Sequence, residues 1–152
     1  MKCFSRHLLA AGLLVCSLHA GAACSVEIAA LSFGSYDTLT PAPNTSTSTV
    51  TVVCSGTAGQ AVSYVIALEG TTTPTRSLRS PAGGVLNYNL YQDVNYTTVW
   101  GNGQGNTPAF PDAYTLSAAS NTRSYTVYGR IPARQNVAAG LYTDAVNVTV
   151  NF

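Results

Sequence analysis

Short runs in which apolar and polar residues alternate recur along the body of this chain and constrain its fold more than any other feature. Alternation with a period of two places apolar side chains on one face of a β-strand. Such runs lie at 25–28, 49–54, 62–68, 86–91, 125–131 and 145–152. Turn-forming residues separate them, and the longest such stretch is 101–108. Because no segment has the 3.6-residue period of a helix, the pattern predicts an all-β sandwich or barrel.

The first 22 residues have the pattern of a secretory signal peptide. A basic start is followed by an apolar run at 8–18 and by Ala20-Gly21-Ala22. The apolar run is too short to span a bilayer, which takes about 20 residues. We therefore expect export, cleavage after Ala22 or alternatively after Ala23, and one domain at 23–152 with no transmembrane segment.

Cleavage removes every histidine and the lysine, side chains on which many enzyme active sites are built. Both histidines (His7 and His19) and the only lysine (Lys2) lie in the predicted signal peptide. Without histidine the mature chain can form neither a Ser-His-Asp triad nor a histidine zinc site, and without lysine it cannot form a Schiff base. We therefore expect no enzyme activity, no catalytic or metal-binding residue and no cofactor.

Charge is scarce in this chain. Charged residues make up 9% of it, and the mature part has a side-chain charge of −1. A nucleic-acid-binding domain usually has a basic patch, so we expect no nucleic-acid partner.

The mature chain retains two cysteines, Cys24 and Cys54. An even pair in an exported protein favours a disulfide. The alternative is a redox-active or metal-binding pair of cysteines. Such a pair usually has a C-x-x-C spacing or a nearby histidine, and in the mature chain these two cysteines have neither. A lipid anchor on Cys24 is a weaker alternative, because Gly21 stands where such signals usually have leucine.

The mature chain also resembles the spore coat U domain, which is the subunit domain of archaic chaperone–usher pili. The segments that carry the resemblance run from end to end: Cys24, Leu31-Ser32-Phe33-Gly34-Ser35-Tyr36-Asp37, Val50-Thr51-Val52-Val53-Cys54, Arg76, Leu78, Leu86-Asn87-Tyr88-Asn89-Leu90-Tyr91, Trp100-Gly101-Asn102-Gly103, Tyr128-Gly129-Arg130-Ile131-Pro132, Gly140-Leu141-Tyr142-Thr143-Asp144 and 146–152.

This resemblance implies an immunoglobulin-like β-sandwich that lacks its last strand and is completed by a donor strand. It also implies export to the periplasm and then to the cell surface, with a periplasmic chaperone, an outer-membrane usher and neighbouring subunits as partners. The function implied is that of a pilus subunit or tip adhesin in adhesion or biofilm formation. Two alternatives stay open: a secreted coat or matrix protein that does not polymerise, and a small secreted carbohydrate-binding module.

The last run, 145–152, is the predicted assembly edge. Val146, Val148, Val150 and Phe152 share one face of it. In a sandwich one strand short, the free edge of this strand would be a template for another chain. The alternative is an internal core strand of a complete sandwich.

Cleavage after Ala22 would leave only Ala23 ahead of the disulfide, too short a tail to donate a strand. We therefore expect the protein at an end of its assembly, at the tip. A ligand-facing loop is then expected between Trp100 and Phe110, the alternative being that Trp100 packs on the sandwich and only the glycines are exposed.

Overall fold

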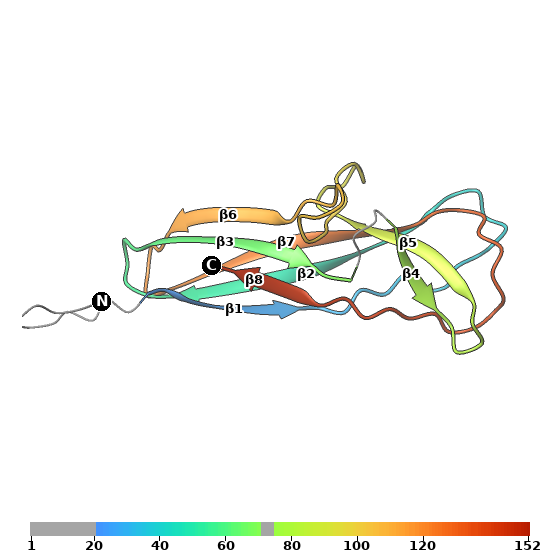
Figure 1. Ribbon diagram of the computed structural model, residues 1–152, viewed down its shortest axis with the longest axis horizontal. Coiled ribbons are helices and arrows are strands. Elements are labelled where there is room, and N and C mark those ends of the chain that lie inside the picture. Colours follow the sequence, from blue (N-terminus) through green and yellow to red (C-terminus); the bar gives the residue numbers. More distant parts are fainter. Residues whose placement is uncertain (1–20, 71–74) are drawn as a thin grey trace, which may run out of the picture.

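The computed structural model describes residues 21–70 and 75–152, and within these ranges the chain forms strands and no helix. Eight strands follow one another: β1 (Ala23–Ile28), β2 (Asn44–Ser55), β3 (Ala61–Leu68), β4 (Arg76–Arg79), β5 (Val85–Tyr91), β6 (Phe110–Thr115), β7 (Ser120–Ile131) and β8 (Val148–Asn151). They form a five-stranded sheet of order β1-β2-β7-β5-β4 and a three-stranded sheet of order β6-β3-β8. All strand pairs are antiparallel. The molecule is an elongated two-layer sandwich (Figure 1), which confirms the predicted all-β, immunoglobulin-like fold.

The alternating pattern of the sequence becomes the core between the two sheets. On β2, Val50, Val52 and Cys54 are fully buried, while Thr51 and Val53 between them are half-buried. Ile66 and Leu68 of β3 face them from the small sheet and are equally buried. Full burial of such a side chain contributes roughly 1.5–3 kcal/mol to the free energy of folding.

Two strands were not predicted, and each has a local reason. β6 contains Pro111 and Asp112, residues that disfavour strands. A proline is tolerated there because β6 is an edge strand with a hydrogen-bonded neighbour on one side only. β4 has four residues, two of them arginines, and is too short to show an alternating pattern.

Two long connectors between strands lie at the same end of the sandwich. The β1–β2 connector (29–43) and the β7–β8 connector (132–147) lie beside β4 and β5, at the end remote from Cys24 (Figure 1). Tyr36 joins the two connectors, since its hydroxyl donates to the carbonyl of Pro132 and accepts the N–H of Gln135, each at 2.8 Å.

Candidate functional site

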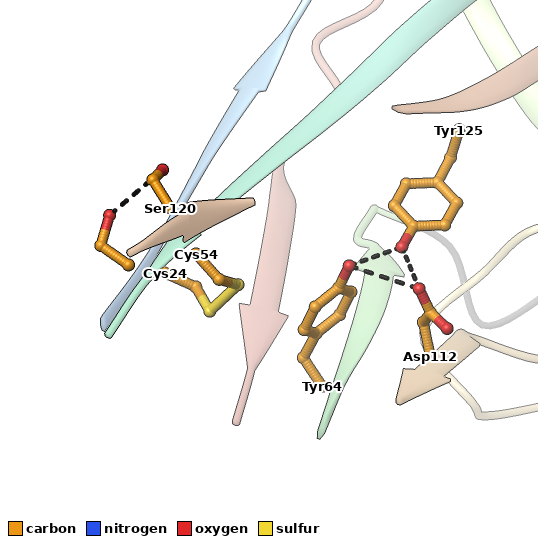
Figure 2. The surroundings of a disulfide bond; sticks show 7 residues. Cys24, Cys54, Tyr64, Asp112, Ser120 and Tyr125 are labelled. Carbon is orange, nitrogen blue, oxygen red and sulfur yellow. Dashed lines mark hydrogen bonds between the residues drawn. A yellow bond between two sulfur atoms is a disulfide. The ribbon is translucent and has the colours of Figure 1, made fainter. Parts of the chain in front are cut away.

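The predicted disulfide between Cys24 and Cys54 is present and joins the two strands at one edge of the large sheet (Figure 2). The two cysteines are direct cross-strand partners of β1 and β2, with their Cα atoms 4.0 Å apart. The bond therefore holds β1, the outermost strand of this sheet, against β2.

The inward face of β1 is left partly uncovered. Val26 and Ile28 follow Cys24 at intervals of two and so share its face, yet their side chains are 38% and 45% exposed. Their partners across the ladder, Val52 and Val50, are fully buried. The small sheet has three strands against five in the large one, so it does not extend far enough to cover β1.

The edge of the small sheet nearest to β1 is β8. Val148 and Val150 lie opposite Leu68 and Ile66 of β3 and pack against the core. β3 is the hydrogen-bonded neighbour of β8, and the other edge of β8 has no strand partner among the described residues. β1 and β8 lie against one another (Figure 1) but are not hydrogen-bonded. Each therefore presents a free backbone edge.

A groove of about 1050 Å³ opens between the two sheets on this side of the sandwich. Ile28 and residues 29–38 line one wall, and residues 137–144 with Val146 line the other. Its floor is the apolar core, formed by Leu68, Leu78, Leu86, Tyr88, Leu90, Val127 and Ile131. A long apolar floor between two extended segments, one following β1 and the other preceding β8, is the shape that an extended strand with alternating apolar side chains would fill.

One polar cluster interrupts the apolar floor. The hydroxyl of Tyr88 donates to a carboxylate oxygen of Asp144 at 2.7 Å. Arg76, on the neighbouring strand β4 and 3% exposed, donates to the carbonyls of Leu68 and Glu69 at 2.9 and 2.8 Å. Burial, and then the bond to Asp144, raise the pKa of Tyr88, so the phenol stays protonated and remains a donor. The cluster ties the end of β3 to β4, β5 and the β7–β8 connector.

The predicted assembly edge differs from the observed strand at both ends. Val148 and Val150 face inward, and Val146 is partly buried in the connector, where it lines the groove. Phe152 is 70% exposed and lies outside the strand. Strand β8 covers 148–151 instead of the expected 145–152, because β3 ends at Leu68 and leaves the earlier residues without a strand to pair with.

The prediction of a ligand-facing surface at Trp100 is wrong. Trp100 is 1% exposed, and its indole N–H donates to the carbonyl of Ile66 at 3.0 Å. The Phe110 ring packs on it with centroids 5.3 Å apart and is itself half-buried. A large aromatic ring with one polar group is best stabilised in the core when that group has a partner, and here Ile66 supplies it.

A second polar cluster, which we did not predict, lies between β3, β6 and β7. The hydroxyls of Tyr64 and Tyr125 are 2.5 Å apart, and both contact the carboxylate of Asp112 (Figure 2). Arg123 forms an ion pair with Asp112 at 3.0 Å. The signal in the sequence was weak, because Asp112 is separated from Tyr64 and Tyr125 by 48 and 13 residues. The cluster joins the two sheets.

Residues 21–70 and 75–152 contain no group of three or more His, Cys, Asp or Glu side chains that could hold a metal ion. In the same part of the chain, no helix is long and apolar enough to cross a membrane.

The fold and the groove define a class, the immunoglobulin-like β-sandwich with an open side between two free strand edges. The Spore Coat Protein U domain model matches residues 10–149, and the chain therefore belongs to this family. It is 31% identical over 148 residues to "Protein U" of Myxococcus xanthus, a match that covers 87% of this chain and 79% of that protein.

A solved structure has the same fold. It is the complex of a chaperone with a tip adhesion subunit before assembly, from the archaic chaperone–usher Csu pili of Acinetobacter baumannii. The match to one of its chains has a TM-score of 0.56 and 20% identity, and it covers 86% of this chain and 40% of that one. At this identity the likeness establishes the fold, and the present chain spans less than half of the matched chain.

Proposed function

We propose that this protein is a non-enzymatic surface subunit of a pilus, and that its groove is completed by a β-strand from another chain. The observation that carries the proposal is the open groove between the segment that follows β1 and the segment that precedes β8, beside two strands with free backbone edges. Its floor is apolar, and inward-facing side chains on both borders are only partly buried. Main-chain hydrogen bonds to a free edge and apolar side chains set into the groove are the two contributions on which strand addition depends.

Membership of the family and likeness to a chaperone-bound subunit support the partners we propose. A periplasmic chaperone would supply the missing strand first, and a neighbouring subunit would replace it during assembly at an outer-membrane usher. A free apolar edge exposed before assembly would otherwise aggregate, which is the physical reason for a chaperone. Adhesion or biofilm formation, and a position at the tip, are further parts of this proposal.

Export is required by this function. The predicted signal peptide lies almost wholly outside the described residues, which begin at Gly21. The division of the chain into 1–22 and 23–152 therefore stays a prediction, to be checked by N-terminal sequencing of the exported protein.

A second function, that of a secreted coat or matrix protein that does not polymerise, is supported by the name of the family, Spore Coat Protein U domain. The two functions differ in whether the edge strand β8 is used by another chain.

The experiment is to express the chain together with the periplasmic chaperone and usher of a pilus system from its own genome. Val148→Asp should abolish the chaperone complex and export to the surface, because a carboxylate on this strand would pack against the apolar core without a partner. Asn151→Asp, on the same strand but exposed, is the matched control and should assemble normally. Export of Val148→Asp at the wild-type level would contradict the proposal.

A further inference from the structure

The outer face of the large sheet, on the side opposite the groove floor, carries three tyrosines that contact one another. Tyr91 of β5 and Tyr128 of β7 are direct cross-strand partners. Their neighbours Leu90 and Val127 are buried in the core, so the two tyrosines point to the opposite face. Tyr96, in the loop after β5, packs edge-on against both, with ring centroids 5.5 and 6.4 Å away. We call Tyr91, Tyr96 and Tyr128 the tyrosine platform.

A cation without a counter-ion borders the tyrosine platform. Arg130 lies two residues after Tyr128 on the same face of β7, and its guanidinium carbon is 5.4 Å from the centroid of the Tyr96 ring. The ion pair found among the described residues is Arg123–Asp112, so Arg130 has no carboxylate partner there. The phenol hydroxyls of the tyrosine platform likewise have no hydrogen-bond partner in this part of the chain. These groups remain free to bind a ligand.

The loop that carries Tyr96 is held in place by its own hydrogen bonds. The carboxylate of Asp93 accepts the backbone N–H groups of Asn95, Thr97 and Thr98 at 2.8–3.2 Å. Tyr96 itself has a φ of +56°, in the left-handed region that residues other than glycine rarely adopt. The position of the ring is therefore fixed before any ligand binds, which lowers the entropic cost of binding.

The part of β2 that lies beside this site is neutral and small. Across the ladder from Tyr128 and Arg130 stand Thr47 and Thr45 of β2, both exposed. Small polar residues such as these threonines are enough to keep the face of a sheet soluble. On β5 and β7, however, aromatic rings and an unpaired guanidinium stand in their place. The adjacent strands β2, β7 and β5, about 4.8 Å apart, give a flat surface roughly 10 Å wide. A surface of this width suits an extended polymer of sugar rings.

We propose that the tyrosine platform and Arg130 bind an anionic polysaccharide whose sugars carry carboxylates. Tyrosine rings offer an apolar surface for the C–H faces of sugars, and their hydroxyls bond to sugar hydroxyls. The guanidinium is a planar fork that matches a carboxylate with two parallel hydrogen bonds. The unpaired positive charge selects an acidic sugar over a neutral one. The site lies on the face opposite the groove and does not depend on strand addition.

The test measures binding of the exported full-length chain to polygalacturonate, to neutral dextran and to poly-glutamate by affinity electrophoresis and calorimetry. We expect binding to polygalacturonate, and at least tenfold weaker binding to the other two polymers. Arg130→Gln and Tyr128→Ser should each weaken binding to polygalacturonate at least tenfold. Near-UV circular dichroism and the urea midpoint confirm that each variant is folded.

Arg123→Gln is the matched control. Arg123 also lies over a tyrosine ring, that of Tyr114 at 4.2 Å, but its charge is paired with Asp112. Its replacement should leave affinity for polygalacturonate within twofold of wild type. No binding to polygalacturonate, equal binding of dextran or poly-glutamate, or equal losses in the Arg130 and Arg123 variants would overturn the proposal. If Arg130→Gln fails to fold, Arg130→Lys keeps the charge, removes the fork and should still weaken binding.

Discussion

Replacing both Cys24 and Cys54 with alanine should destabilise the protein strongly and release β1 first. The disulfide joins residues 30 apart in sequence. On the loop-entropy model, closing a loop of about 31 residues in the unfolded chain is worth about 3.7 kcal/mol. Small domains have a free energy of unfolding of roughly 5–15 kcal/mol, so this loss is a large share of the total.

The structure indicates that the loss of stability should appear first at β1. β1 pairs with β2 alone, and its inward-facing Val26 and Ile28 remain partly exposed, with Ile28 at the groove. Little apolar burial therefore holds β1 once the covalent bond is gone. Because β1 borders the groove, the variant should lose one wall of that site along with its stability.

Urea denaturation of the oxidised protein and the double alanine variant, with hydrogen exchange of residues 25–28, measures both effects. Ser55→Ala is the matched control, because Ser55 follows Cys54 on β2 and is exposed. It should change stability by less than about 0.5 kcal/mol. A loss below about 1 kcal/mol in the double variant, with β1 amides still protected, would refute the reasoning.

Two further predictions concern single side chains. Tyr88→Phe removes the donor to Asp144 and should cost about 1.5–3 kcal/mol in urea denaturation, so a stability equal to wild type would show that this bond contributes nothing. The carboxylate of Asp93 accepts backbone N–H groups, that of Thr98 foremost, and this lowers its pKa from the usual 3.8. Because the folded pKa is depressed, the bonds stabilise the loop at neutral pH, and that contribution is lost as pH falls below 3.8 toward the folded pKa. An NMR titration should find the Asp93 pKa below 3.8 with loss of Thr98 amide protection under acid, and a pKa at or above 3.8 would contradict this.

Much of the fold could be predicted because alternation reports which face of a strand is buried. The runs at 62–68 and 86–91 match β3 and β5 closely. β7 begins at Ser120, earlier than the expected 125, because it follows the whole length of its partner β2. Residues 120–124 are polar and form a strand because they pair with β2, not because of an alternating pattern of their own. Pairing between distant segments cannot be read from a single sequence.

The candidate site was harder to predict because it depends on contacts between distant segments. The groove wall at 29–38 contains no alternating run and became visible only in the structure. Trp100 lies in a segment rich in Gly and Asn, which predicts exposure, but the ring inserts into the core. The tyrosine platform combines a strand pair with a loop residue in a left-handed conformation, and neither position is marked by a motif.

The central claim is that the groove, which lies between the segments that follow β1 and precede β8, accepts a strand along the free edge of β8. The most direct measurement is hydrogen exchange on the full-length chain with and without a synthetic peptide of about ten residues that alternates valine and threonine. A peptide with aspartate at the valine positions is the control. We expect the valine peptide alone to protect the β8 amides that face away from β3 and to raise the melting temperature, since each buried valine contributes about 1.5 kcal/mol or more. Unchanged exchange in β8, or equal protection by the aspartate peptide, would contradict the account.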